Sequence, residues 1–244
     1  MNWIGLVPAA GQGTRLGLPF PKELYPLIQK NYLKPVCQNV IEQLREAGVE
    51  DIVVVINETK YQIISYLKSG MSLSCNFIYV YQERRSIEFT NSTSPGLAHA
   101  IDSAYHVIKD KLVFFGMPDT VVFPNNVFSQ GLSSINDSDV ILCLFRTDTP
   151  YKFGMVKRDR NGRVIEVIDK PAYSQLDLMW GYIIWKPDFT NFIHDQVKHS
   201  ISEFSIIINN AISQGIKFNS IVVKDGKYYD FGTVEDLIKI KKQF

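Results

Sequence analysis

Residues 6–16 read Leu-Val-Pro-Ala-Ala-Gly-Gln-Gly-Thr-Arg-Leu, and residues 21–24 read Pro-Lys-Glu-Leu. An apolar strand at residues 3–7 therefore leads directly into a loop of small residues, and Arg15 and Lys22 follow it closely. Glycines and alanines let backbone N–H groups approach a ligand, and such a cradle suits phosphate oxygens. Arg15 and Lys22 add positive charge where those phosphates would lie. The stretch predicts a nucleotide-binding loop, called the glycine loop below (residues 9–16).

Two common phosphate-binding schemes do not fit this loop. The dinucleotide fingerprint requires a third glycine three residues after Gly13, where Leu16 stands. The P-loop requires Gly-Lys-Ser/Thr, which occurs nowhere in the chain. The loop is therefore a nucleotide-binding loop of another type, or a tight strand-to-helix turn whose glycines serve backbone geometry alone.

Apolar strand-like segments alternate with helical patterns along the chain. Helices are predicted over residues 35–47, 60–68 and 96–108, and strands over residues 4–7, 52–56, 77–81, 112–115, 140–145, 164–168 and 181–185. The alternation predicts one α/β domain over residues 1–244, with a mixed, mostly parallel sheet and helices on both faces. Ligands bind beyond the carboxyl ends of such strands, where the glycine loop, Gln82 and Asp119 all fall.

The composition narrows the class of protein. The 244 residues carry a formal net charge of +1, with 45% hydrophobic and 21% charged residues, as in an ordinary globular enzyme. No long basic stripe points to nucleic acid as a partner. We expect a cytoplasmic protein without a membrane partner, because no leader and no apolar run near 18 residues is present. The three cysteines are scattered without metal-binding spacing, which suits buried thiols in a reducing compartment.

The motifs resemble one known family. Residues 9–16 and Pro21-Lys22 match the amino-terminal motif of the sugar-phosphate nucleotidylyltransferases, and the resemblance runs from about residue 4 to residue 240. Residues 21–24 and 117–119 look most like the glucose-1-phosphate uridylyltransferase branch, and other features are shared with the thymidylyltransferases. The resemblance implies a single-domain Rossmann-like (GT-A-type) fold. It also implies transfer of a nucleoside monophosphate from UTP or dTTP to a sugar 1-phosphate, with Mg²⁺ as cofactor and pyrophosphate as the second product.

The same resemblance implies which residues form the site. Nucleotide binding falls to Ala9, Ala10, Gly11, Gly13, Thr14, Gln82 and Gly96. Sugar-phosphate binding falls to Gly154, Asp169, Lys170, Gly181 and Tyr182. Arg15 and Lys22 are the implied catalytic cations, and Asp119 and Asp230 are the implied Mg²⁺ ligands. Mg²⁺ takes oxygen ligands and is commonly held by one or two carboxylates beside phosphate oxygens.

The two aspartates also have plainer interpretations. Asp119 follows a strand, where aspartate is a common turn former. Asp230 precedes a helix expected to begin near Val234, although Thr233 is the better capping candidate.

Several positions depart from the family pattern. Asp169 is one methylene shorter than the family's Glu, and Phe153 stands where the family has Tyr. Between Gln82 and Gly96 lie 13 residues where relatives have only a few. This insertion (residues 83–95) is expected to be a lid, an oligomer contact or, by default, a passive surface loop. Trp180 is interpreted as a packing residue.

Three other functions remain as alternatives. One is a related nucleotidylyltransferase that uses CTP, GTP or another phosphorylated acceptor. Another is a nucleotide-sugar-dependent glycosyltransferase, which usually carries an Asp-x-Asp motif after a strand, whereas Asp137-Ser138-Asp139 precedes one. A non-catalytic nucleotide-binding regulator would be expected to lack Arg15, Lys22 or an aspartate, and all are present. A homo-oligomer is possible in each case.

Overall fold

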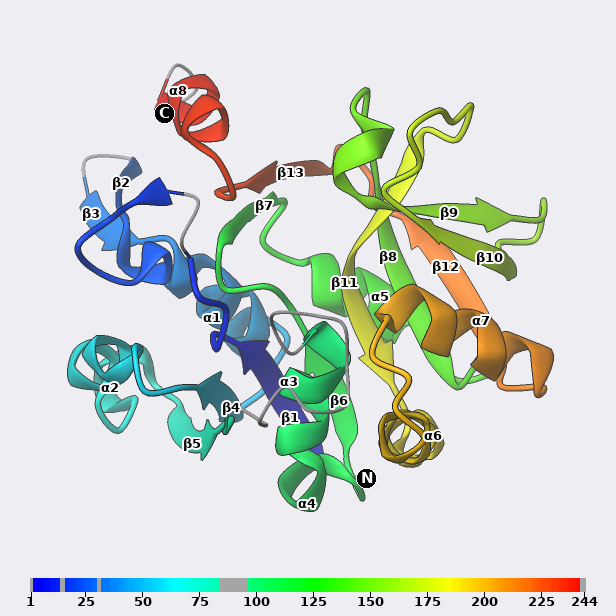
Figure 1. Cartoon of the computed structure of the whole chain (residues 1–244), viewed down its shortest axis with the longest axis horizontal. Helices are drawn as coiled ribbons and strands as arrows, with labels where there is room; N and C mark the ends of the chain where they lie inside the picture. The colour runs from blue at the N-terminus through cyan, green and yellow to red at the C-terminus, as the bar shows by residue number, and fades with distance from the viewer. Residues whose placement is uncertain (1, 14–15, 30–31, 84–95, 242–244) are drawn as a thin grey trace.

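The computed structural model describes residues 2–13, 16–29, 32–83 and 96–241, and Figure 1 follows the chain through them. The interpretations of Thr14, Arg15 and nearly all of the insertion therefore lie outside the described residues. A nine-stranded mixed sheet runs through the molecule, with a hydrophobic core on each of its faces.

One half of the sheet is parallel. Its strands lie in the order β5 (Asn76–Tyr81), β4 (Asp51–Ile56), β1 (Trp3–Pro8) and β6 (Leu112–Phe115). Apart from the first residue of each, β1 and β4 are buried throughout, and β6 is buried along its whole length. Strands covered on both faces have continuous apolar sequences, as these three do.

The other half of the sheet is built around β11 (Leu178–Trp185). This strand lies antiparallel to β6, to β8 (Val140–Arg146) and to β9 (Gly154–Arg158). β9 continues antiparallel into β10 (Val164–Asp169), whereas β12 (Phe218–Val222) runs parallel to β8. The expected α/β fold with a mixed sheet is confirmed.

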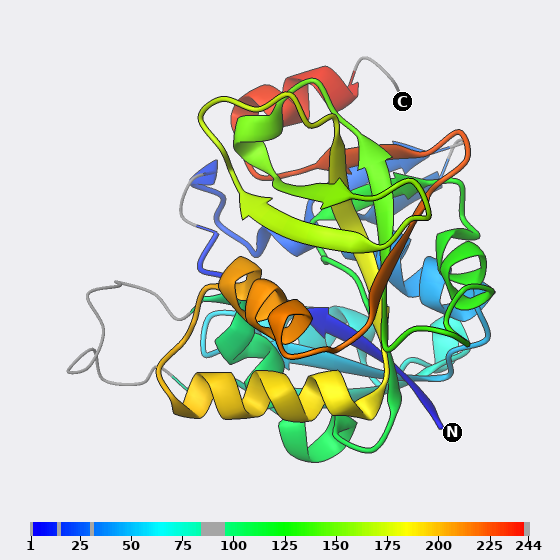
Figure 2. The same cartoon turned by 90° about the vertical axis from the view of Figure 1, so that its right-hand side faces the viewer.

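Helices that come from both halves of the chain cover one face. They are α3 (Leu97–Ser103), α4 (Tyr105–Ile108), α6 (Pro187–Lys198) and α7 (Phe204–Ser213). Figure 2 shows α6 and α7 stacked one above the other against the sheet. Their apolar residues form one core with alternate residues of the strands beneath them.

The opposite face is covered by α1 (Cys37–Glu46), α2 (Tyr61–Leu67) and α5 (Val127–Leu132). α1 lies close to the sheet at Gly5, where an added Cβ would be 2.9 Å from Cδ1 of Leu44. A side chain at this position of β1 would therefore push α1 away from the strand.

Two small sheets and three short turns complete the described fold. β2 (Pro26–Gln29) pairs with β3 (Tyr32–Pro35), and β7 (Thr120–Phe123) pairs with β13 (Lys227–Asp230). α8 (Val234–Lys241) follows β13. The 3-10 turns are η2 (Lys22–Leu24), η3 (Met71–Leu73) and η5 (Pro150–Lys152). A third, smaller core joins β2, Val36 before α1, β7 and the segment after β13.

All of the strands predicted from the sequence coincide with observed strands, and the predicted helices at residues 35–47 and 60–68 coincide with α1 and α2. The helix predicted over residues 96–108 is divided at Ala104 into α3 and α4. Within the part of the chain that the structure describes, no helix combines the length and apolar character needed to cross a bilayer.

Candidate active site

The glycine loop leaves β1 and is held by the neighbouring strand β4. The backbone N–H of Ala9 donates to the carbonyl of Val55 at 2.7 Å, and Nδ2 of Asn57 donates to the carbonyl of Ala10 at 2.5 Å. Ala9 and Ala10 are buried, whereas Gly11 is exposed. Gly13 has a φ of +67°, a conformation that glycine adopts without strain. The loop is therefore anchored at its base and open to a ligand at its tip.

Lys22 and Asp119 form an ion pair at the carboxyl ends of the parallel strands. η2 carries Lys22, and Asp119 follows β6, so the pair joins segments far apart in the sequence. Burial opposes the charge of Lys22, but the Asp119 carboxylate, its hydrogen bond, and the charges of Glu23 and Asp230 outweigh that effect and raise the pKa of Lys22. The site therefore keeps a cation at neutral pH.

Asp119 and Asp230 are brought together by β7 and β13. Asp230 stands opposite Thr120 in this antiparallel pair, and the backbone N–H of Phe231 donates to the carbonyl of Asp119 at 2.9 Å. Thr233 caps α8, because its Oγ1 accepts the backbone N–H of Asp236 at 3.3 Å. Helix capping therefore does not account for Asp230.

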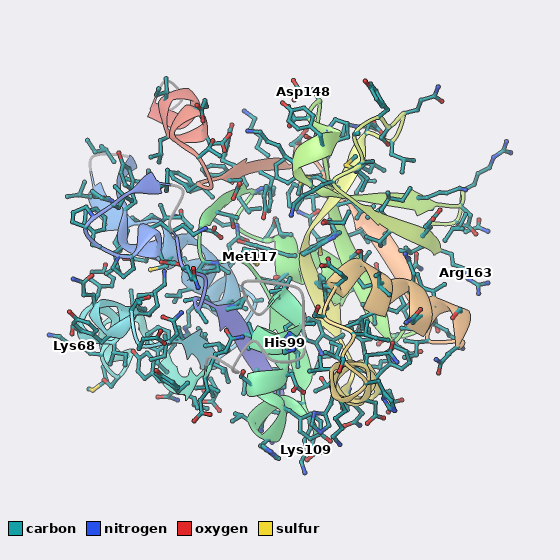
Figure 3. The ribbon with its side chains drawn as sticks, viewed as in Figure 1. Lys68, His99, Lys109, Met117, Asp148 and Arg163 are labelled. Carbon is teal, nitrogen blue, oxygen red and sulfur yellow. The ribbon has the colours of Figure 1, made fainter. Side chains whose placement is uncertain are left out.

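Both carboxylates line one cavity of about 430 Å³ between the two halves of the molecule. Figure 3 labels Met117, which lies near the centre of the molecule and lines the same cavity. Further lining residues that the sequence predicted are Lys22, Gly96, Gly154, Asp169 and Lys170. The cavity therefore joins much of the implied phosphate-binding side to much of the implied sugar side.

Gly154 is required by the shape of the sugar side. A Cβ on Gly154 would lie 2.9 Å from Cδ1 of Trp180 and closer still to its Nε1. The indole can therefore reach the cavity wall only because residue 154 has no side chain. Lys170 begins the next loop, and its backbone N–H donates to the carbonyl of Phe153 at 2.9 Å.

Gly181 and Tyr182, implied as sugar-pocket residues, do not lie on the cavity wall. Tyr182 is fully buried and stacks on Phe128 with a centroid separation of 4.5 Å. An added Cβ on Gly181 would lie 2.6 Å from the ring of Phe145 and 2.8 Å from the ring of Tyr228, so Gly181 is enclosed by packing. Neither residue lines the cavity.

A bulge in β11 explains why Trp180 lines the cavity and Tyr182 does not. Trp180 lies opposite Leu144 and Tyr182 lies opposite Cys143, so Gly181 is an extra residue in the strand. The bulge reverses the alternation of side chains, and Trp180 and Tyr182 pack in different cores. Trp180, interpreted as a packing residue, also lines the cavity.

The nucleotide side contains a buried side-chain amide at Gln82. Gln82 directly follows β5, and its Nε2 is buried without a hydrogen bond in the described part of the chain. Gln82 is not among the residues that line the 430 Å³ cavity. Gly96 precedes α3, and an added Cβ there would lie 3.1 Å from the carbonyl oxygen of Ser202.

Several functional candidates were missed by the sequence analysis. Lys152, Glu203 and Tyr228 line the cavity, and the sequence analysis gave them no role. Burial, then the charges of Asp230 and Asp119, raise the pKa of Tyr228 well above its ordinary value, so its hydroxyl remains a hydrogen-bond donor. A buried ion pair between Lys60 and Glu23 was also missed, because nothing in the local sequence indicates that these charges are buried.

Curated proteins of similar sequence include two with related names. The chain is 25% identical over 262 residues to a Bacillus subtilis (strain 168) protein provisionally named UTP–glucose-1-phosphate uridylyltransferase, with 96% of this chain and 94% of that protein covered. It is 26% identical over 257 residues to a glucose-1-phosphate thymidylyltransferase of Streptomyces griseus. That alignment covers 97% of this chain but only 64% of the Streptomyces protein.

Solved structures share the fold. A UDP-glucose pyrophosphorylase complexed with UDP-glucose superimposes with a TM-score of 0.80 at 24% identity, covering 100% of this chain and 98% of the other. The family model described as nucleotidyl transferase matches residues 4–244. Because this match spans nearly the whole chain, the protein belongs to the nucleotidyl transferase family, as the sequence resemblance implied.

Proposed function

We propose that the protein transfers a nucleoside monophosphate from UTP or dTTP to a sugar 1-phosphate and releases pyrophosphate. The observation that carries this proposal is the single cavity that joins Lys22, Asp119 and Asp230 to Gly154 and Lys170. Such a cavity accommodates two phosphate-bearing substrates with their reacting groups between the cations. The names of the Bacillus and Streptomyces relatives support the same reaction.

The proposed reaction has no covalent enzyme intermediate. An oxygen of the sugar 1-phosphate attacks the α-phosphorus, a new phosphoanhydride bond forms, and the bond to the β-phosphate breaks as pyrophosphate leaves in line. Positioning two anions and stabilising charge is the main task of the protein in phosphoryl transfer. In this scheme Lys22 contacts the α-phosphate, Lys170 holds the incoming sugar phosphate, and Arg15 steadies the pyrophosphate.

Asp119 and Asp230 are proposed to hold Mg²⁺. Their oxygens suit this hard cation, and the pairing of Asp119 with the Lys22 ammonium is consistent with a cation at this carboxylate. Across the described residues no group of three or more His, Cys, Asp and Glu side chains could hold a metal, so substrate phosphate oxygens and water would complete the shell. Bound Mg²⁺ would neutralise charge on the phosphates that meet in the cavity.

Gln82 is proposed to recognise the base. A primary amide offers both a donor and an acceptor and can pair with the imide edge of uracil or thymine. The buried Nε2 of Gln82 has no hydrogen-bond partner among the described residues, which supports this role because a buried donor gains a hydrogen bond when a base binds.

A substrate matrix tests the proposed function. UTP, dTTP, CTP, GTP and ATP are each combined with several sugar 1-phosphates and Mg²⁺, and released pyrophosphate is measured. We expect turnover with UTP or dTTP and its loss in a chelator, restored by added Mg²⁺. A preference for GTP or ATP would contradict the role of Gln82, and absence of pyrophosphate from every pair would contradict the reaction.

A matched variant tests the metal site. Asp230→Asn keeps the size of the side chain but removes its charge, so we expect a large rise in the Mg²⁺ concentration needed for half-maximal turnover. Asp225→Asn, in the turn before β13, is the control and should leave that concentration unchanged. A wild-type Mg²⁺ requirement in Asp230→Asn would remove this residue from the scheme.

A further inference from the structure

A buried ion pair lies directly behind the glycine loop. Nζ of Lys60 donates to Oε1 and Oε2 of Glu23 at 3.0 and 2.8 Å, and both side chains are about 1% exposed. Removing two charges from water is costly, and attraction between them repays this cost only when the geometry is good. Many buried ion pairs can be replaced by apolar residues without loss of stability. Stability alone therefore does not explain why charges occupy this position.

The pair joins two segments of the proposed triphosphate site. Glu23 lies on η2 directly after Lys22, and Lys60 precedes α2. A Cβ on Gly13 would lie 3.8 Å from Nζ of Lys60 and 3.7 Å from Cγ of Lys22. The side chains of both lysines therefore lie beside Gly13 of the glycine loop.

The loop that carries Lys60 also holds the base of the glycine loop. Nδ2 of Asn57 donates to the carbonyl of Ala10 at 2.5 Å. Oδ1 of Asn57 accepts the backbone N–H and the hydroxyl of Thr59 at 2.9 and 2.8 Å, which fixes the amide. Lys60 is tied to the same residue, because its backbone N–H donates to the carbonyl of Asn57 at 3.0 Å. Asn57 and Lys60 therefore move as one unit.

We propose that Asn57, Lys60 and Glu23 form a brace that sets the position of Lys22 and of the glycine loop for the triphosphate. These are positioning residues: they hold the groups that meet the substrate without touching it themselves. The inference rests on the proposed function, because it assumes that Lys22 and the glycine loop bind a nucleoside triphosphate. It predicts that damage to the brace weakens triphosphate binding and leaves the sugar side intact.

The first test compares Lys60→Met with the wild type. Binding of UTP with Mg²⁺ is measured by calorimetry, the KM for glucose 1-phosphate by pyrophosphate release, and folding by thermal melting. We expect the Kd for UTP to rise about tenfold or more, while the KM for glucose 1-phosphate stays within about twofold. Lys34→Met is the matched control, because it breaks the Lys34–Glu42 ion pair, and neither of these residues lines the cavity. It should change neither constant.

The charge-swapped variant Glu23→Lys/Lys60→Glu separates positioning from a direct charge effect. It restores the ion pair, so a brace predicts a Kd for UTP within about threefold of the wild-type value. A swapped protein that folds but binds as weakly as Lys60→Met overturns the inference, because the Lys60 charge would then act on the phosphates directly. If Lys60→Met does not fold, the swapped variant alone tests the brace: a Kd for UTP within about threefold of the wild-type value supports it, and a Kd raised about tenfold or more overturns it.

The experiment distinguishes failure of the brace from failure of the proposed function. A folded Lys60→Met variant that binds UTP like the wild type overturns the brace but leaves the proposed function standing. Wild-type protein that binds neither UTP nor dTTP and releases no pyrophosphate overturns the proposed function itself. The wild-type measurement therefore identifies which of the two has failed.

Discussion

The close approach of Trp180 to Gly154 gives a sharp prediction for Gly154→Ala. The new methyl group would lie 2.9 Å from Cδ1 of the indole and closer still to Nε1, so the indole must move. The rings of Phe115 and Phe204 also pack against Trp180, with centroids 6.4 and 5.9 Å away. The open direction is the cavity, where the displaced indole would compete with the sugar phosphate.

The magnitude follows from the cost of overpacking. Inserting one methyl group into a packed site costs about 1–3 kcal/mol, which is about 5- to 150-fold in an equilibrium constant. We therefore expect Gly154→Ala to raise the KM for the sugar 1-phosphate by that factor and to leave the KM for the triphosphate within about twofold. Steady-state pyrophosphate release with each substrate varied in turn measures both constants.

A second variant shows whether the indole carries the effect. Trp180→Phe removes the ring atoms that meet the new methyl group, so Gly154→Ala should cost less in that background than in the wild type. An unchanged KM for the sugar 1-phosphate in the single variant, at an unchanged Tm, would refute the reasoning. If Gly154→Ala raises the KM for the sugar 1-phosphate equally in both backgrounds, the clash with Trp180 does not cause that rise.

Three further predictions follow from residues at or near the cavity. Lys22→Ala should lower kcat by about 10²–10³, because a charged contact to the transition state is lost, and a folded variant with wild-type kcat would contradict that role. Tyr182→Phe should leave both KM values within about twofold of the wild type, because the ring is buried against Phe128. A change in the KM for the sugar 1-phosphate alone would indicate that the Tyr182 hydroxyl contributes to sugar binding. Burial raises the pKa of Cys143 to about 12, and Cys37 and Cys75 are also buried with raised pKa values, so few thiolates exist at pH 8. A disulfide reagent should therefore modify no thiol until the protein unfolds, and rapid reaction of native protein would contradict the packing around these residues.

The sequence predicted the parallel half of the sheet because its strands are short, wholly apolar segments separated by helical patterns. It did not predict β7 and β13, which are brief and pair across more than a hundred residues. No local pattern records which distant segment a strand joins. The motifs nevertheless identified Asp119 and Asp230, and the structure brings them together through that unpredicted pair.

The sequence analysis and the structure differ at two places, on the sugar side and behind the glycine loop, for different reasons. Gly181 and Tyr182 were placed in the pocket by their position in a motif, and a bulge redirects the side chains around them. Lys60 and Glu23 were missed because charged residues are usually exposed, and only the packed fold shows that these two are not.

Because of the extra residue in β11, the strand register as well as residue identity determines which side chains line the cavity. Deletion of Gly181 would leave Trp180 opposite Leu144 and Tyr182 opposite Cys143, so regular alternation would be restored with the flanking side chains on their present faces. Met179 and Tyr182 would remain in one core, and the indole of Trp180 would remain packed against the other. Alignment with a relative that lacks this extra residue must therefore place the gap at Gly181, because an ungapped alignment would compare side chains on opposite faces of the strand.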